Sequence, residues 1–537
     1  MQSRSLRVLV FLALILWGLT SRSFAQFETA AVLGTVFDSA KAVVQQAHIT
    51  LLNLDTGTSQ DAVSTSDGSY QFLEVRVGRY RVTTEAAGFK KSQTPDFLVD
   101  VGVRLRVDVQ LQVGNLEQSI SVTAAPSMLE SESSYRGQLI DNEQVVDLPL
   151  NGRSSASLAL LAPGVRLTYG LSKRESSFNI NGMRSQFNDF ILDGLDNNAY
   201  GTSNQGLSNQ VVQVAPDAVQ EFSVITDNYS AEYGRVGGGV VNASVRSGTN
   251  QLHGTVWEFL RNTDLNAVGY FAPLGGQKPI YIQNQYGLAA GGPIRKDKMF
   301  LFLDYEGWRR LQKAVSFASV PTLNQRIGIF GSGFAIKNPY TGAVYTNGTI
   351  PQADMTAFGL KVFSQMPSPN LPGNTNNYQA LLPSTDNENK GDVRYDQYLT
   401  RKISLFERAS YNLYHQLAAP AVDGPSGQGA GIKSRVMNWQ TASGITWITG
   451  PNSLLEIRFG ASDTEGMKTP ATLDGVANML QLYGIPGLPT AKNIIGGLNT
   501  QNITGYQSYG RDYTSPQWQN PLVINPKVNF SALRRNL

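Results

Sequence analysis

Cysteine is absent from this sequence of 537 residues, and histidine occurs only at His48, His253 and His415. Without cysteine the chain can have neither disulfide bonds nor thiolate metal sites. No histidine has an acidic residue at the short spacing of a zinc site, which argues against a metallopeptidase. The Gly-x-Ser-x-Gly elbow of many hydrolases is also missing. We therefore predict no catalytic residue, no metal site and no cofactor.

Long apolar runs are equally scarce. The longest candidate, Val8–Leu19, follows Arg4 and Arg7 and precedes the small-x-small pattern Ser23–Ala25. It is too short for a membrane-spanning helix, which needs about 20 apolar residues. The arrangement instead predicts a secretory signal peptide over residues 1–25. A membrane-spanning part of the remaining chain would have to be a closed β-barrel.

The charge balance is neutral once this peptide is removed. Its loss takes away Arg4, Arg7 and Arg22 and no acidic residue, so the formal net charge falls from +3 to zero. Binding to nucleic acid requires a strongly basic surface. We predict no nucleic-acid partner.

Residues 27–113 show short strands of alternating polarity, separated by turn residues. In residues 101–113, valine and leucine alternate with polar residues, which predicts one strand with a buried face. Asp67-Gly68 predicts a hairpin turn, and Asp55-Thr56-Gly57 predicts a second one. Together these features predict a small β-sandwich.

Two stretches of this sandwich carry a family resemblance: GTVFDSAKAVVQQAHITLLNLDTG and STSDGSYQFLEVRVGRYRVTTEAAGF. They resemble the carboxypeptidase regulatory-like domain, a prealbumin-like sandwich with a carbohydrate-binding-like fold. The resemblance implies a fold rather than an activity, because such modules act as spacers and docking domains as often as binders.

Residues 129–250 have mixed patterning, and Ser154–Leu161 predicts a short helix that ends at Pro163-Gly164. Three stretches resemble the α+β plug domain of TonB-dependent outer-membrane receptors: DLPLNGRSSASLALLAPGV, FNINGMRSQFNDFILDGLDNN and PDAVQEFSVITDNYSAEYGRVGGGVVNASVRSGTN. The positions that match the family pattern in the last stretch are Val219, Glu221, Val224, Tyr233, Gly234, Gly238, Gly239, Val241 and Asn242.

The glycine cluster at 237–239 is predicted to mark the end of this plug. The residues singled out for the plug-to-barrel transition are Tyr233, Gly234, Gly238, Gly239 and Asn242. The last plug strand is expected over 239–245, with its glycines packed closely against the barrel wall. The cluster lacks the Gly-Lys-Ser/Thr that a phosphate-binding loop requires.

A calcium site is a second interpretation of the plug sequence. Oxygen ligands could come from the stretch NDFILDGLDNN, through Asp189, Asp193, Asp196 and Asn197. The spacing lacks the loop glycine and the terminal glutamate of an EF-hand. Turns and structural carboxylates are the favoured interpretation.

The linker at 114–128 contains one extended stretch just ahead of the plug. TonB-dependent receptors carry their TonB box at this place, and the candidate box comprises Ser119, Ile120, Ser121, Val122, Thr123 and Ala124. The resemblance implies a TonB-type periplasmic energy-transducing protein as partner, bound by β-augmentation. A plain linker strand is the alternative.

Beyond His253 the strands alternate apolar and polar residues. Leu455, Ile457 and Phe459 share one face of a strand, and Glu456 and Arg458 share the other. A soluble sandwich would bury the apolar face, whereas a membrane barrel turns it toward lipid and its charges toward the lumen. Periodicity alone fits both.

The context favours the barrel. A signal peptide and a plug-like segment precede these strands, and tryptophans stand near predicted strand ends at Trp257, Trp308, Trp439 and Trp447. Residues 251–537 are therefore predicted to form the first part of a transmembrane antiparallel β-barrel in outer-membrane lipid. Long external loops are predicted at Pro321–Asp392 and Ala418–Lys433.

The barrel segment is short for this architecture. It has room for about a dozen strands, whereas plugged transporters have about 22. We expect a fragment or a truncated reading frame.

The whole layout resembles an Oar-like TonB-dependent receptor. The resemblance implies an importer of an unidentified ligand, with oligosaccharides, siderophores, cobalamin and peptides as candidates. Two alternatives stay open: a surface adhesin that binds glycans through the sandwich, and a secreted β enzyme with paired carboxylates.

Overall fold

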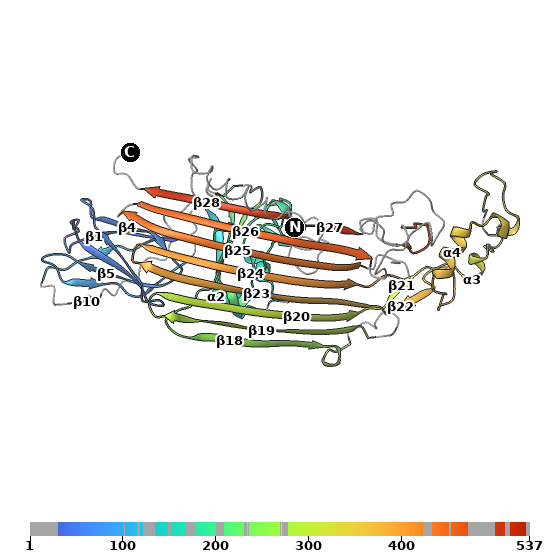
Figure 1. Ribbon diagram of the computed structural model, residues 1–537, viewed down its shortest axis with the longest axis horizontal. Helices are drawn as coiled ribbons and strands as arrows, with labels where there is room; N and C mark the ends of the chain where they lie inside the picture. The colour runs from blue at the N-terminus through green and yellow to red at the C-terminus, as the bar shows by residue number, and fades with distance from the viewer. Residues whose placement is uncertain are drawn as a thin grey trace, which may run out of the picture.

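The computed structural model describes residues 30–532 except for 101–102, 115–118, 122–134, 149, 151, 168–177, 200–208, 230–232, 235, 269, 271–275, 277, 334, 423–431, 451–452, 471–499 and 511–515. The predicted signal peptide at 1–25 lies outside the described residues. Figure 1 shows a long antiparallel sheet, with a small β-domain at one end of its strands and a loop region with short helices at the other.

The N-terminal domain is a β-sandwich, as predicted. One sheet has the order β4-β1-β8, with β9 also paired to β1, and the other has the order β10-β6-β5-β2-β3, with β7 paired to β5. The two sheets enclose a single apolar core that includes Val32, Ile49 and Val82. The strands are β1 (Ala30–Phe37), β2 (His48–Asn53), β3 (Ser59–Val63), β4 (Ser69–Val75), β5 (Gly78–Glu85), β6 (Lys91–Gln93), β7 (Phe97–Val99), β8 (Arg104–Arg106), β9 (Val109–Gln110) and β10 (Ser119–Ser121).

The alternation predicted for residues 101–113 is confirmed in burial but not in continuity. The alternate residues from Val103 to Leu111 are buried, whereas Val113 is 72% exposed. Two short strands, β8 and β9, replace the single long strand, and both run parallel to β1. Alternating polarity reports which side is buried, but it carries no information on where the ladder is interrupted.

One of the two predicted hairpins is confirmed. Strands β2 and β3 pair antiparallel across Asp55–Gly57. Asp67 and Gly68 also form a tight turn, in which Gly68 has a φ of 75°. The hairpin predicted there is wrong, because β3 and β4 belong to different sheets. This turn carries the chain from one sheet of the sandwich to the other.

The central domain, residues 135–250, is built on a five-stranded sheet of order β11-β16-β17-β14-β15. Its core includes Phe178, Phe222 and Val224. The helix predicted at Ser154–Leu161 is present as a 3₁₀ helix, and a short helix, α2, was not predicted. The elements are β11 (Arg136–Asp141), α2 (Asn142–Asp147), η2 (Ser155–Leu161), β12 (Val165–Leu167), β13 (Phe178–Ile180), η3 (Ser185–Phe187), β14 (Asp189–Leu192), β15 (Leu195–Asp196), η5 (Pro216–Ala218), β16 (Val219–Asp227) and β17 (Val240–Val245).

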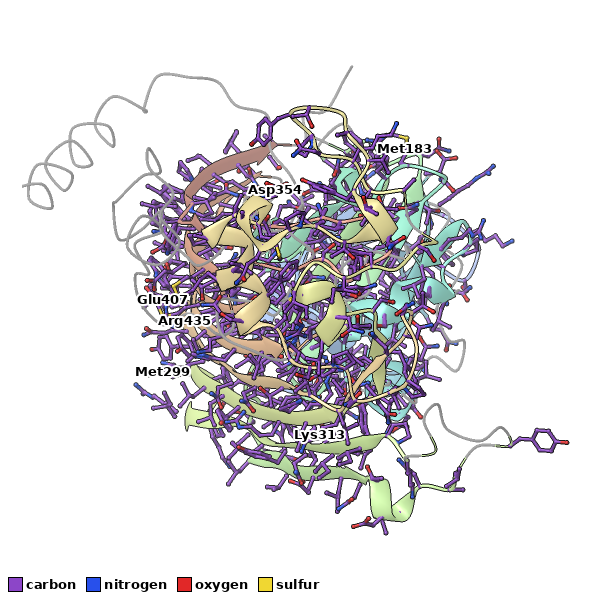
Figure 2. The ribbon with its side chains drawn as sticks, turned by 90° about the vertical axis from the view of Figure 1, so that its right-hand side faces the viewer. Met183, Met299, Lys313, Asp354, Glu407 and Arg435 are labelled. Carbon is purple, nitrogen blue, oxygen red and sulfur yellow. The ribbon has the colours of Figure 1, made fainter. Side chains whose placement is uncertain are left out.

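The C-terminal part forms a nine-stranded antiparallel sheet. Its order follows the sequence, β18-β19-β20-β23-β24-β25-β26-β27, and β28 also pairs with β26. Viewed along the strands, the sheet curves around the central domain (Figure 2). The strands are β18 (His253–Asn262), β19 (Ile280–Arg295), β20 (Met299–Lys313), β23 (Pro383–Thr400), β24 (Ile403–Ala418), β25 (Ile432–Gly450), β26 (Ser453–Pro470), β27 (Gln517–Gln519) and β28 (Leu522–Ala532).

The two faces of this sheet have the inverted polarity that a membrane barrel requires. Ile457 and Phe459 are 45% and 36% exposed, whereas Glu456, which precedes Ile457 on the same strand, is 1% exposed. Around this position of β26 the outward residues are apolar, and the inward residues Glu456 and Arg458, which face the central domain, are charged, whereas Phe300 and Phe302 of β20 are buried apolar residues of the inner face. A soluble sandwich would show the opposite pattern. Trp308 departs from the prediction, because it is buried on the inner face instead of marking the outer rim.

The predicted external loop at Pro321–Asp392 is shorter than expected, since β23 already begins at Pro383. The inward residues Asp386, Glu388, Lys390 and Asp392 are polar and buried, so this part of the strand showed no apolar alternation. Strand β21 (Ser316–Ala318) precedes this loop, and η6 (Thr263–Leu265) lies in an earlier one. The short elements within the loop are α3 (Leu323–Arg326), η8 (Thr346–Gly348), η9 (Gln352–Asp354), α4 (Ala357–Gln365) and β22 (Tyr378–Ala380). Among the residues that the structure describes, no helix has both the length and the apolar character needed to cross a membrane.

Candidate functional site

The hairpin between β14 and β15 of the central domain makes many polar contacts with the large sheet. Its tip residues, Asp193 and Gly194, have φ angles of 47° and 83°, which is the type I′ geometry of a two-residue hairpin. Oδ1 of Asp193 accepts hydrogen bonds from Arg394 at 2.8 Å and from the backbone N–H of Val245 at 3.1 Å. Oδ2 lies 2.7 Å from Nε of Arg408. The carboxylate is thus paired with two guanidinium groups.

The backbone of the same hairpin is also held by the sheet. Arg458 donates to the carbonyl of Asp193, Lys527 donates to the carbonyl of Gly194, and Gln440 donates to the carbonyl of Asp196. With Arg394 and Arg408, these donors come from β23, β24, β25, β26 and β28. The hairpin tip is therefore held by hydrogen-bond donors from five strands of the sheet. We call the tip together with these donors the hairpin anchor.

Asp396 on β23 joins all three parts of the molecule. It accepts hydrogen bonds from Arg394 on its own strand at 2.9 and 3.2 Å, and from Ser247 of the central domain at 2.6 Å. Arg76 of the sandwich donates to it at 2.6 Å. The Asp396 side chain is 1% exposed, so these are contacts of a desolvated carboxylate with every acceptor position in use.

Arg153 forms a second anchor on the central domain. Its Nε lies 3.0 Å from Glu306 of β20, and a further guanidinium nitrogen pairs with Asp217 of the central domain. The guanidinium also stacks over Trp257 and Phe259 of β18, with centroid distances of 5.0 and 4.8 Å. Arg153 itself has a φ of 50°, a strained conformation for a residue other than glycine that surrounding contacts must maintain.

The electrostatic character of both anchors follows from their burial. The side chains of Arg408 and Asp193 are 0% and 4% exposed, and those of Arg153 and Glu306 are 11% and 2% exposed. Removing one member of such a pair leaves an uncompensated buried charge, whereas the intact pair contributes little net free energy once desolvation is counted. The anchors fix the position of the central domain without making its attachment irreversibly strong.

Of the predicted transition residues, Gly238 and Gly239 lie beside Asn188 at the opposite end of β14 from the hairpin anchor, whereas Asn242 pairs with Ile191 in the middle of that strand. Tyr233 packs with Ile225 and Val240, and Asn242 is buried within β17. A Cβ on Gly238 would lie 2.3 Å from Oδ1 of Asn188, whereas one on Gly234 would meet nothing within 4 Å.

The prediction that these glycines pack against the barrel wall is wrong. A Cβ on Gly239 would lie 2.6 Å from the carbonyl of Ile225 and 2.7 Å from Cδ1 of Ile180. Both neighbours belong to the central domain. The close approach thus serves packing within that domain, because β17 runs alongside β16 and over β13 at this point.

The candidate TonB box is described in part. Ser119, Ile120 and Ser121 form β10, which pairs in parallel with Lys91, Ser92 and Gln93 of β6. Val122, Thr123 and Ala124 lie outside the described residues. The first half of the candidate box is therefore an edge strand of the sandwich.

The calcium interpretation is not supported by the geometry. Asp193 faces guanidinium groups, and Asp196 accepts hydrogen bonds from the backbone and side chain of Asn198, both at 2.8 Å. These are the structural carboxylates and turns that the sequence favoured.

Comparison with known proteins matches three segments of the chain. The Outer membrane beta barrel domain model matches residues 244–536, the TonB-dependent Receptor Plug Domain model matches 130–241, and the Carboxypeptidase regulatory-like domain model matches 31–112. The chain belongs to the TonB-dependent receptor family. The central domain is its plug and the large sheet is its outer-membrane barrel segment. The family is one of receptors and transporters, not of enzymes.

The chain is similar to one TonB-dependent transporter in sequence and, at low identity, to solved outer-membrane proteins. The TonB-dependent transporter Oar of Myxococcus xanthus is 29% identical over 302 residues, which are 53% of this chain and 27% of that protein. The outer membrane transporter YddB of Escherichia coli has 11% identity and a TM-score of 0.47, over 75% of this chain and 46% of that one. A ferric enterobactin receptor of Pseudomonas aeruginosa has 14% identity and a TM-score of 0.39, over 62% and 41%. This receptor chain thus spans less than half the length of these relatives.

The sequence did not single out the residues that hold the plug. Arg153, Arg394 and Arg408 are arginines in otherwise ordinary stretches, and Arg394 lies 201 positions from Asp193. The available signal was a charged residue at an inward position of a barrel strand, opposite an apolar outward face. Such a residue must find a partner on the plug or in the lumen.

Proposed function

We propose that this protein is an outer-membrane receptor that binds a ligand at the cell surface and admits it to the periplasm when a TonB-type partner pulls on the plug. The observation that carries this proposal is the hairpin anchor. A plug that must move and return needs contacts that specify one position and can be remade. Buried ion pairs between Asp193 and two barrel arginines have that character, since separated charges regain hydration.

The N-terminal side of the plug supports a mechanical connection. Strand β10, which holds the first half of the candidate TonB box, pairs with only three residues of β6. It is the terminal strand of its sheet in the described part of the chain. An edge strand offers unpaired backbone groups, which is the requirement for β-augmentation by a partner protein.

The sandwich also contacts the barrel directly. Arg76 reaches Asp396, and Arg401 in the turn after β23 lies 3.1 Å from Asp61 of β3. The first pair is buried and the second is exposed, so the first carries more of the docking specificity. We propose that the sandwich, residues 27–113, docks against the periplasmic mouth and orients the linker at 114–128. We also propose that a signal peptide at residues 1–25 directs export of the chain.

Deleting residues 119–124 tests the import function. Cells are given radiolabelled ferric siderophore, cobalamin, maltooligosaccharide or peptide, and surface binding is measured separately from uptake. The deletion should abolish uptake of the ligand that the intact receptor takes up and leave its surface binding unchanged. Uptake that persists in the deletion would contradict the proposal.

Cross-linking tests the partner. Because the chain has no cysteine, an Ile120→Cys variant carries a single thiol, and a TonB-type protein with one engineered cysteine should form a disulfide with it. A Thr65→Cys variant on the sandwich is the control and should not cross-link. Equal cross-linking of both variants would indicate random collision instead of recognition.

The adhesin alternative predicts a different result from the same deletion. An adhesin that uses the sandwich as glycan binder would be indifferent to loss of residues 119–124. Adhesion to glycan-coated surfaces, measured alongside uptake, separates the two functions.

A further inference from the structure

We propose that the cavity between the sandwich and the barrel rim binds a phosphate-bearing anion, through Lys298 and Lys402 together with Arg76 and Arg401. The cavity measures about 360 Å³. One wall comes from the sandwich, at Gly57–Gln60 and Tyr80, and the other comes from the turns that follow β19 and β23. It does not depend on the import function.

The charge of the lining is strongly one-sided. Four cationic residues line the cavity, and Asp297 is the acidic residue among the lining positions. Asp297 is already engaged, because its carboxylate accepts a hydrogen bond from Asn250 at 2.7 Å. Because Arg76 and Arg401 are paired with Asp396 and Asp61, the excess positive charge of the cavity comes from Lys298 and Lys402, and such an excess attracts an anion from solution.

Two of the cations have no partner of their own. In the described part of the chain, the ammonium groups of Lys298 and Lys402 make no ion pair, whereas Arg401 pairs with Asp61 and Arg76 with Asp396. An ammonium group is a compact charge with three donors, and phosphate is a usual ligand for it. The lysines therefore supply the free charge, and the arginines shape the site.

The tyrosines add a neutral surface to the cavity. Burial raises the pKa of the Tyr80 phenol, so its hydroxyl stays protonated. The Arg76 guanidinium lies 5.0 Å from the centroid of the Tyr398 ring. Neither ring introduces a negative charge that would repel an anion.

The level of the cavity relative to the membrane points to a source for the phosphate. Ile403 lines the cavity and is the register partner of Trp447. Trp447 is 47% exposed on the outer face, and Leu399, another lining residue, is 51% exposed. Tryptophan on the lipid-facing surface marks the membrane–water interface. Lipid headgroups lie at that level, and basic pockets there bind anionic headgroups.

An occupied cavity would also affect the plug. Arg76 both lines the cavity and donates to Asp396, which in turn accepts from Ser247 of the plug. An anion that draws Arg76 toward itself competes with Asp396. Arg76 in the cavity is thus connected to Ser247 of the plug through one shared partner, Asp396.

The test uses the full chain purified in detergent. Native mass spectrometry measures retention of phosphatidylglycerol, and isothermal titration measures binding of inorganic phosphate. The double variant Lys298→Gln/Lys402→Gln should bind phosphatidylglycerol about 30-fold more weakly, because each lysine near an anionic headgroup contributes about a fivefold factor. If inorganic phosphate binds with the same lysine dependence and the lipid does not, the site is supported with a soluble ligand as its source.

Matched variants keep the result interpretable. Lys296→Gln removes a lysine from the same turn that does not line the cavity, and Lys361→Gln removes one from α4 at the other end of the molecule. Both should bind as the unmodified protein does. All variants must show the heat-modifiable migration of a folded barrel. Equal binding of both ligands by the double variant and the unmodified protein would overturn the proposal.

Discussion

Arg394 of the barrel donates a hydrogen bond to Asp193 of the plug at 2.8 Å and, with its other nitrogens, holds Asp396 on its own strand. One guanidinium therefore connects the plug hairpin to the carboxylate that also receives Arg76 from the sandwich. Three parts of the chain that are distant in sequence meet at the pair Arg394 and Asp396.

Substituting Asp193→Asn should weaken the plug attachment by about 3 kcal/mol, because Arg394 and Arg408 keep their buried charges and lose their shared partner. Urea-dependent proteolysis of the plug measures this as a lower urea midpoint. Asp227→Asn, at an exposed position at the other end of the plug sheet, is the control and should change stability by less than about 0.5 kcal/mol. Equal midpoints for the two variants would contradict the role of the hairpin anchor.

The same substitution at Asp304 should have the opposite sign. Asp304 lies directly across from Asp392 in the β20–β23 ladder, and both residues are buried. Like charges at directly opposed positions destabilise a sheet. Asp304→Asn should therefore leave the urea midpoint unchanged or raise it. A clear loss of stability would show that this carboxylate has a partner.

A double-mutant cycle on Arg153 and Glu306 should give a coupling free energy of about 1–3 kcal/mol. The cycle uses Arg153→Met and Glu306→Gln, which keep most of each side-chain volume. Arg435 and Glu465 are a matched pair, since their N–O distance of 3.1 Å is similar but both side chains are partly exposed, at 34% and 49%. Their cycle should give less than about 1 kcal/mol. Similar coupling in both cycles would mean that burial does not strengthen the plug anchor.

Gly239→Ala should reduce assembly of the barrel with its plug, whereas Gly234→Ala should not. The added methyl group at Gly239 would meet the Ile225 carbonyl and the Ile180 side chain, and at Gly234 it would meet open space. Overpacking of this kind costs about 1–3 kcal/mol. The folded fraction in outer-membrane preparations, judged by heat-modifiable migration, measures the effect. Normal assembly of the Gly239 variant would show that the plug can shift to make room.

The sequence predicted the architecture well because its main signals are local. Alternation on β26 separated the outward Ile457 from the inward Glu456, and the plug stretches carried family patterns over many residues. The strand from Pro383 to Asp392 was missed because its outward residues Thr385, Asn387 and Asn389 are polar, as its inward residues are. Alternation disappears where both faces of a strand are polar.

The plug anchors could not be predicted in the same way. Asp193 was recognised as a turn carboxylate, but nothing near it in sequence identifies Arg394 or Arg408 as partners. The pairing depends on the register of β23 against β24 and on how far the hairpin reaches into the barrel. Both are properties of tertiary packing, as is the contact of Gly239 with Ile180 in place of the barrel wall.

The hairpin anchor has a mechanical consequence. Short-range ion pairs oppose the first small displacement of Asp193 steeply, because a buried charge loses its partner before water reaches it. Once water enters, both charges are hydrated again and further movement meets little resistance. Under the import function proposed above, the hairpin anchor resists the first small displacement of the plug strongly and further displacement weakly, and the same contacts form again when the pull ends.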